Sequence, residues 1–382
     1  MRKIIVIIIT VSLLAAVLSG CSDNGVTDTT NVQDTPSGNG ASNVQETPGG
    51  QGSTNTADPS QPAKTGNKLN IVSTIFPQYD WVRQILGDRA GDMDLVLLLN
   101  NRIDLHNFQP SVDDIVRIAA CDLFIYVGGE SDGWVEGVLK QATNPNMVTI
   151  NLLEILGDEA RLDEILEGLE EIHDDHGHGH SHGHSHGHGH DDDDDDDDDD
   201  DHDHEYDEHV WLSLTNAAIF STVIADAISE LDPNFAEDYR ANMTAYAMKL
   251  LDLDMEFKAA VDAASVRTVL FGDRFPFRYL MEDYGVGFYA AFPGCSAETE
   301  ASFSTIVFLA TKMNENNLKY VMVTESADQS IARTIISNTA AKNQQILVLD
   351  AMQSVTQFDV ENGTTYLSIM MENLNVLRQA LS

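Results

Sequence analysis

Short apolar runs alternate with amphipathic segments along the first structured stretch of the chain. Runs rich in Ile, Val and Leu predict strands at residues 69–73, 95–99, 123–127 and 147–151. Apolar residues at helical spacing predict helices between them, at about 79–86, 112–120 and 134–141, and a further helix at about 159–171. Strands that alternate with helices predict a parallel sheet covered on both faces.

The same alternation returns in the last third of the chain. Strands are predicted at residues 268–271, 286–290, 320–324 and 346–349, with helices at about 275–284, 300–314, 330–342 and 365–381. Between the two stretches we expect helices at 214–231 and at about 233–264, and the second of these contains no glycine and no internal proline. It would form a rigid connector roughly 45 Å long. The predicted fold is therefore α/β, with two Rossmann-like lobes whose parallel sheets are joined by a long rigid helix. The ligand site is expected in the crevice outside the carboxyl ends of the strands.

The N-terminus has the pattern of an exported bacterial lipoprotein. Arg2 and Lys3 precede an apolar stretch, and Leu18-Ser19-Gly20-Cys21 matches a lipoprotein cleavage site, with lipidation at Cys21. The apolar stretch is short for a membrane span, and a polar segment follows it at once. Residues 22–67 are too poor in large apolar side chains to offset their ordering entropy and predict a flexible linker. We expect a protein anchored to the cell membrane by its lipid, on the extracytoplasmic face.

About two fifths of the net charge of -41 lies in one segment. Residues 174–208 hold seventeen acidic residues and no Lys or Arg. Nowhere are basic residues clustered enough to neutralise a phosphate backbone, so nucleic acid is not expected as a partner, and cations are the natural partners. The predicted organisation is a signal peptide at 1–21, a linker at 22–67, an N-terminal lobe at 68–172, a disordered His/Asp-rich insert at 173–208, helices including the connector at 209–264, and a C-terminal lobe at 265–382.

The insert is dominated by histidine and aspartate. Twelve of the thirteen histidines lie between residues 173 and 209, and an unbroken Asp run occupies 191–201. Imidazole and carboxylate are the ligands of borderline divalent metals such as Zn2+. The Gly and Ser spacers argue for many weak, interchanging sites, and a purely solvated spacer is the alternative. The expected low-affinity ligands are His176, His178, His180, His182, His184, His186, His188, His190, His202 and His204.

Four further residues are candidates for one tight metal site. His106, Asp273 and Asp350 each follow a predicted strand, and His209 closes the insert just before a helix. Because the carboxyl ends of parallel strands meet at one edge of a sheet, these side chains are expected to share a cleft. For His106 taken alone, an ordinary hydrogen-bonding role is the alternative.

The two cysteines outside the leader are interpreted as packing residues. Cys121 lies in an apolar run. Cys295 could act as a soft metal ligand, but a small loop or core residue is the favoured interpretation. Their separation in sequence gives no support to a disulfide.

Several motifs together indicate a family. The lipoprotein start, the His-rich acidic insert and the long helix accompany the segments Asp104-Leu-His-Asn-Phe-Gln-Pro-Ser111, Glu208-His-Val-Trp-Leu-Ser213 and Leu349-Asp-Ala-Met352. This combination resembles the zinc/manganese solute-binding lipoproteins of bacterial ABC transporters, of the high-affinity zinc uptake type. The resemblance implies one metal ion held between two α/β lobes. It matches His106 and His209 to the family's first two histidine ligands and Asp350 to its carboxylate.

The third ligand of that family is where this chain departs. The family places a His or Glu five residues before a Tyr, and the count from Tyr279 ends on Arg274, which stays protonated and cannot bind a metal. Asp273 is the expected replacement, with a salt bridge to Arg274 or a helix cap as the alternatives. Glu298 and Glu300 are weaker candidates.

The resulting hypothesis is an extracytoplasmic receptor that captures Zn2+ and delivers it to the membrane subunit of an ABC permease. A mixed set of imidazoles and carboxylates would also accept Mn2+, so a manganese receptor is one alternative, and a surface zinc buffer or adhesin is another. We expect a monomer. We also expect no catalytic activity, because no set of nucleophile, base and orienting group recurs in the sequence. A metal-dependent hydrolase is the enzyme alternative, and the absence of a His-Glu-x-x-His pattern counts against it.

Overall fold

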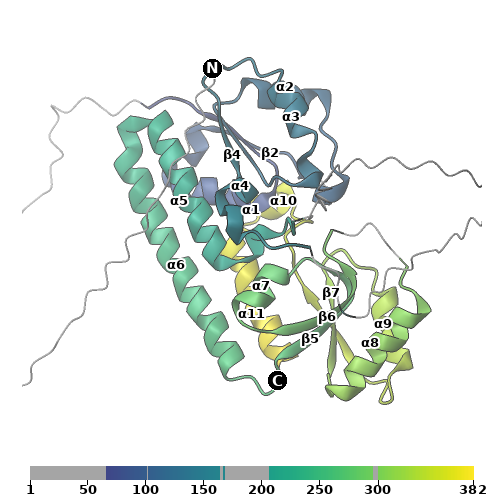
Figure 1. The fold of residues 1–382 in the computed structure, drawn as a ribbon. Helices are drawn as coiled ribbons and strands as arrows, with labels where there is room; N and C mark the ends of the chain where they lie inside the picture. Colours follow the sequence, from purple (N-terminus) through teal and green to yellow (C-terminus); the bar gives the residue numbers. More distant parts are fainter. Residues whose placement is uncertain (1–65, 101, 164–166, 168–205, 296–299) are drawn as a thin grey trace, which may run out of the picture. The chain divides into compact units, whose positions relative to one another are not determined.

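Two four-stranded parallel sheets form the framework of the computed structural model (Figure 1). The structure describes residues 66–100, 102–163, 167, 206–295 and 300–382, all within one unit, Pro62–Ser382. The strand order is β2-β1-β3-β4 in the first sheet and β6-β5-β7-β8 in the second, so both sheets have the same topology. The strands are β1 (Asn70–Ser73), β2 (Asp94–Leu97), β3 (Leu123–Tyr126), β4 (Val148–Asn151), β5 (Thr268–Phe275), β6 (Gly287–Pro293), β7 (Tyr320–Thr324) and β8 (Gln345–Leu349). The predicted fold class is confirmed.

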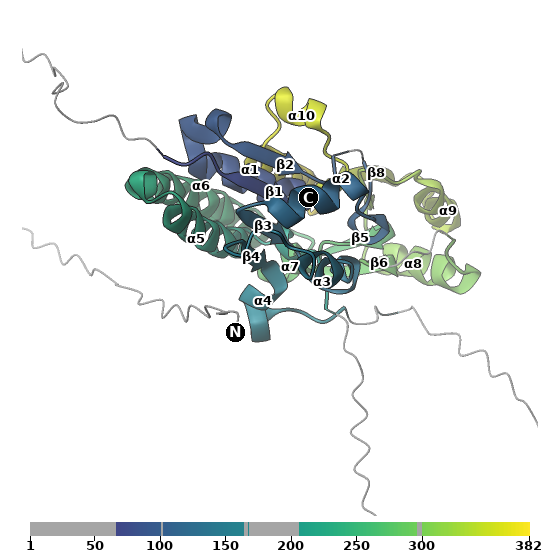
Figure 2. The same cartoon turned by 90° about the horizontal axis from the view of Figure 1, so that it is seen from above.

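Helices cover both sheets and join them. The α-helices are α1 (Phe76–Leu86), α2 (Val112–Ala120), α3 (Val135–Leu139), α4 (Leu152–Leu156), α5 (Leu214–Leu231), α6 (Ala236–Asp262), α7 (Arg278–Asp283), α8 (Phe303–Glu315), α9 (Ser330–Asn338), α10 (Gln357–Glu361) and α11 (Tyr366–Ala380). The 3₁₀ helices are η1 (Gly87–Asp92), η2 (Leu105–Asn107), η3 (Glu130–Asp132), η4 (Gly157–Glu159), η5 (Val210–Leu212) and η6 (Pro233–Phe235). Figures 1 and 2 show α5 and α6 lying side by side, with α8 and α9 against the second sheet.

The predicted connector is α6, a helix of 27 residues, which is about 40 Å long at 1.5 Å per residue. One face of α6 is buried at steps of three and four residues, as an amphipathic helix requires; its buried residues are Tyr239, Tyr246, Leu250, Leu253, Phe257 and Val261. It packs against α5 and α1 at the first sheet and against α11. Helix α11 also contacts β8, so the two helices tie the second sheet to the first.

Helix α5 is long and apolar enough to cross a membrane by length and composition alone. In this fold it packs against α1 and α6. Its side chains Ala217, Phe220, Ile224 and Ile228 are fully buried in the shared core. A core helix of this kind accounts for its apolar character.

Two predicted helices are corrected by the structure. The helix expected at about 159–171 is absent from the described part of that range, where Leu162 instead forms an antiparallel bridge with Tyr206. The helix expected from residue 275 begins at Arg278, because β5 continues to Phe275 and pairs there with Pro293 of β6. The proline at position 276 lacks the N–H needed to extend the strand ladder.

Candidate metal centre

His106 lies beyond the carboxyl end of β2, in η2. The carboxylate of Asp104 accepts a hydrogen bond from the His106 backbone N–H at 3.1 Å and so caps this short helix. The ring atom Nδ1 lies 2.7 Å from Oγ of Ser131 and 3.3 Å from Oε2 of Glu208. A carboxylate can only accept, so Glu208 favours the tautomer with the proton on Nδ1. The lone pair of Nε2 is then available to a metal.

His209 is fully buried and is held in the same way. Oδ1 of Asp207 lies 2.9 Å from Nδ1 of the ring and also accepts the His209 backbone N–H at 2.9 Å. A carboxylate behind each histidine is the usual support of a metal-binding imidazole, because it orients the ring and fixes the tautomer. The consecutive residues Asp207 and Glu208 thus support His209 and His106 respectively.

The Nε2 atoms of the two histidines face each other. Nε2 of His106 and Nε2 of His209 are 3.4 Å apart. Two nitrogens bound to one tetrahedral zinc at 2.0–2.1 Å would be separated by roughly 3.3 Å. The pair is therefore already spaced for a shared metal ion.

A third candidate ligand atom lies near this pair. The Sγ atom of Cys295 and one nitrogen each of His106 and His209 all lie within 4.8 Å of one another. Cys295 follows β6 and Gly294, and a Cβ added at Gly294 would lie only 3.1 Å from the His209 ring and 2.9 Å from the Phe275 carbonyl oxygen. Glycine at position 294 therefore lets this turn approach the histidine.

The centre has a strongly acidic surrounding. Four carboxylates lie at or beside the three candidate ligands: Asp104, Asp163, Asp207 and Glu208. Two arginines, Arg274 and Arg278, form ion pairs with members of this set. Burial raises the pKa of the Cys295 thiol far above its usual range, and the neighbouring charges of Asp207, Asp163 and Glu208 raise it further. The four carboxylates outnumber the two arginines, and the excess of negative charge favours the arrival of a cation.

The same carboxylates act on His106. Burial lowers its pKa, but the hydrogen bond to Glu208 and the charges of Asp104 and Glu208 outweigh burial and raise the pKa above the ordinary value. The pKa of the Glu208 carboxyl is lowered, because its hydrogen bonds to His106 and Ser131 outweigh burial. In the metal-free protein the His106–Glu208 pair thus favours the charged form of both partners.

Asp273 does not join the three-residue group. Its Oδ2 accepts a hydrogen bond from the Thr324 backbone N–H at 3.0 Å and another from the Thr324 hydroxyl. The next residue, Arg274, lies 2.7 Å from the carboxylate of Asp104 and is the one directed toward the centre. The pairing of β5 with β6 shifts register between Phe271 and Arg274. A bulge of this kind changes the direction of the side chains beside it, and here it is Arg274 that faces the centre.

Asp350 also lies outside this group. Its Oδ1 accepts the Met352 backbone N–H at 2.7 Å, and burial together with the charge of Glu325 raises its pKa to about 7. Glu325 in turn accepts hydrogen bonds from the backbone N–H groups of Ala351 and Gln353 at 2.9 and 3.1 Å. Both carboxylates therefore order the loop that follows β8.

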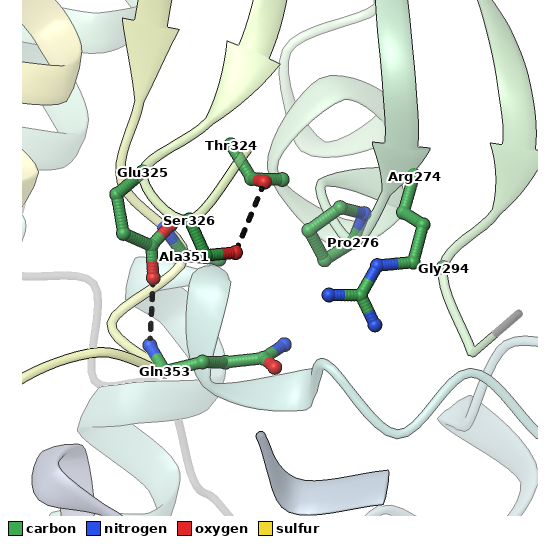
Figure 3. A pocket seen from close by; sticks show the side chains of 8 residues that line it. All are labelled: Arg274, Pro276, Gly294, Thr324, Glu325, Ser326, Ala351 and Gln353. Carbon is green, nitrogen blue, oxygen red and sulfur yellow. Dashed lines mark hydrogen bonds between the residues drawn. The ribbon is translucent and has the colours of Figure 1, made fainter. Parts of the chain in front are cut away.

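That loop brings Gln353 to the centre. In Figure 3, Gln353 and Arg274 point into one small pocket from different elements. With the amide nitrogen of Gln353 facing Asp104 at 2.8 Å, the amide oxygen lies 2.9 Å from Nε2 of His209. Gln353, three residues after Asp350, is the residue of this loop that touches a candidate ligand.

Several predicted residues fall outside the described chain. They are Cys21, Glu298 and the insert histidines His176, His178, His180, His182, His184, His186, His188, His190, His202 and His204. Glu300 is described and is exposed to solvent. Residues that the sequence reasoning did not single out are Ser131, Asp207 and Gln353, while Glu208 was noted only within a motif. The available signal was the placement of two acids immediately before His209.

Comparisons with known proteins identify related chains. The sequence profile described as "Zinc-uptake complex component A periplasmic" matches residues 71–380. The high-affinity zinc uptake system protein ZnuA of Bacillus subtilis (strain 168) is 30% identical over 316 residues, which cover 83% of this chain and 88% of that protein. The zinc-binding lipoprotein AdcA of Streptococcus pneumoniae (strain ATCC BAA-255 / R6) is 29% identical over 320 residues, or 84% of this chain, and the match spans only 57% of that relative.

A solved structure shares the fold. The crystal structure of the Zn(II)-bound ZnuA-like domain of Streptococcus pneumoniae AdcA is 26% identical and superposes with a TM-score of 0.59. The superposition covers 82% of this chain and 99% of that domain. The similarity therefore extends over both sheets described above.

Proposed function

Because the chain belongs to the family of zinc-uptake complex component A proteins, we propose that it is an extracytoplasmic receptor that captures Zn2+ and delivers it to an ABC permease. The observation that carries this proposal is the pair of imidazoles, His209 fully buried and His106 partly buried, whose Nε2 atoms lie 3.4 Å apart. The names of the relatives, a zinc uptake protein and a zinc-binding lipoprotein, support zinc over manganese. A lipid on Cys21 would hold the receptor, as a monomer, at the outer face of the membrane.

His106 and His209 are the proposed ligands of the captured ion. Each ring is oriented by a carboxylate at Nδ1, so binding requires no reorganisation of either imidazole. Asp273 and Asp350, whose oxygens accept hydrogen bonds from Thr324 and Met352, take supporting roles in the fold. The protein moves its ion and does not convert it, so we propose no catalytic activity.

The His/Asp-rich insert serves this receptor as a weak collector. Leu162 and Tyr206 form a bridge, and the Asp207 N–H donates to the Arg161 carbonyl at 2.9 Å, so the described residues on both sides of the insert meet next to the centre. Weak sites tethered there would raise the local zinc concentration at the tight site. Imidazole binds metal only when neutral, so the collector should empty as the pH falls through about 6.5.

Zinc titration of the full chain against a competing chelator tests the receptor. We expect one tight site that is lost in His106→Ala and in His209→Ala, and several weak sites that are lost when residues 174–203 are deleted. If the tight site disappears with the insert while His106→Ala retains it, the insert itself is the function and the receptor proposal fails. Tighter retention of Mn2+ than of Zn2+ in a competition experiment would overturn the choice of metal.

A further inference from the structure

We propose that Cys295 is the third protein ligand of the captured zinc, bound through its thiolate in place of a third imidazole. The inference rests on the proposed function, because zinc is the cargo that His106 and His209 are proposed to hold. Its direct basis is the cluster in which Sγ of Cys295 and one nitrogen of each histidine lie within 4.8 Å of one another. Among the described residues this is the group of His, Cys, Asp and Glu side chains arranged closely enough to hold a metal ion.

The geometry needs only a small adjustment to become a zinc site. With Zn–N at 2.0–2.1 Å and Zn–S at about 2.3 Å, the sulfur and nitrogen atoms of a tetrahedral site are roughly 3.6 Å apart. The Cys295 sulfur, which lies within 4.8 Å of both nitrogens, therefore has to approach each of them by at most about 1.2 Å to complete the site. The two nitrogens already have their tetrahedral separation, at 3.4 Å.

The sulfur is held by groups that also support the histidines. The Glu208 backbone N–H acts to lower the pKa of the Cys295 thiol against the effect of burial, and the Cys295 backbone N–H acts in the same sense on the pKa of the Asp163 carboxyl. An N–H donor directed at a thiolate stabilises its negative charge. Gly294 permits the approach, since a side chain there would collide with the His209 ring.

The position of Arg274 explains why a new ligand is needed. The family resemblance places the third imidazole at this position, and the structure shows the guanidinium paired with Asp104 at 2.7 Å instead. Strands β5 and β6 are neighbours, with Arg274 opposite Phe292 and Phe275 opposite Pro293. Cys295 comes two residues after Pro293, so it reaches the centre from the end of β6, next to β5, where Arg274 occupies the position of the family's third ligand.

Thiolate ligation alters the expected metal preference. A soft sulfur ligand favours zinc, whereas carboxylate and carbonyl oxygen suit manganese. Zinc would displace the thiol proton to solvent and gain one formal negative charge in its coordination shell. Two imidazoles and one thiolate would leave a position for a fourth ligand, next to which the amide of Gln353 lies.

Cobalt substitution tests the sulfur directly. With one equivalent of Co2+ added to the full chain, we expect the near-ultraviolet absorption of a thiolate-to-cobalt charge transfer. It should vanish in Cys295→Ser and persist in Cys121→Ser, the matched control at the other described cysteine, which is buried in the first lobe. Zinc affinity should fall at least about 100-fold in Cys295→Ser, beyond the usual cost of losing a supporting residue.

A wild-type measurement keeps the test decisive even where Cys295→Ser folds poorly. One equivalent of zinc should slow alkylation of Cys295 by iodoacetamide, mapped by mass spectrometry, and should not slow it when His106 is replaced by Ala. Tight zinc binding without a sulfur band, and without protection of Cys295, would overturn the thiolate ligand while leaving the receptor intact. Absence of tight zinc binding in the wild-type chain would instead refute the receptor itself.

Discussion

Replacing Glu208 by Gln isolates the support of His106. The wild-type carboxylate accepts the Ser131 N–H at 2.8 Å through Oε1 and faces Nδ1 of His106 at 3.3 Å through Oε2. A glutamine can keep the first contact, but its NH2 group then meets Nδ1–H, donor against donor. The ring is driven toward the tautomer with its proton on Nε2, the atom that should bind zinc.

The expected loss in zinc affinity is 10- to 100-fold, or about 1.4–2.7 kcal/mol, as for other carboxylates that support metal-bound histidines. Chelator competition on the full chain measures the loss. Proton NMR of the imidazole should show a lower His106 pKa, because Glu208 is among the groups that raise it. Glu130→Gln, at an exposed position beside Ser131, is the control. An unchanged affinity with a correctly folded Glu208→Gln protein would refute the tautomer argument.

Three further predictions concern the pH dependence of zinc binding, the backbone at Gly294 and the ion pair between Arg274 and Asp104. When the pH is lowered, zinc affinity should begin to fall before the pH reaches about 6.5, because the raised pKa of His106 lets protons compete with zinc at a higher pH. The stability of the zinc-free protein should change in the opposite direction, because the contribution of His106 is lost as the pH rises through its raised pKa. Gly294→Ala should weaken zinc binding, because the added Cβ would lie 3.1 Å from the His209 ring. Gly137→Ala, where an added Cβ meets open space, should leave the zinc affinity unchanged. Arg274→Gln should cost about 1–3 kcal/mol of unfolding free energy by leaving Asp104 without its charged partner.

Each of these predictions has a contrary outcome. A binding curve that stays flat until well below pH 6 would show that His106 is not a ligand or is not raised in pKa. Equal effects of the two alanine substitutions on zinc affinity would remove the steric role of position 294. An Arg274→Gln protein as stable as the wild type in urea would mean that the pair with Asp104 contributes nothing measurable, as for many surface ion pairs.

The repeated alternation of apolar runs was sufficient to predict the two parallel sheets and the long helix. Periodicity reports which face is buried, and the strands and most helices therefore lie where the pattern places them. The described residues in the range 159–171 do not form the expected helix, and amphipathic spacing cannot reveal that Leu162 pairs with Tyr206, a residue beyond the insert. That pairing is a tertiary contact without a local signal.

The site was predictable in part. The rule that strand ends share an edge identified His106, and the motif closing the insert identified His209. The strand-end rule does not give the direction of a side chain, so it could not distinguish Asp273, which contacts Thr324, from Arg274, which faces the centre. Nor could it weigh Cys295, whose proximity depends on a glycine turn packed against the His209 ring.

Three consecutive residues, Asp207–His209, lie at the centre formed by His106, His209 and Cys295. Asp207 holds the His209 ring, Glu208 contacts His106 and acts on the Cys295 thiol, and His209 is itself a proposed ligand. An ion bound at this centre therefore depends on one short segment, and a shift of that segment would loosen all its protein bonds together. We therefore expect zinc release to follow a displacement of this segment, and hydrogen exchange at the amides of Asp207–His209 is the quantity that should follow the release rate.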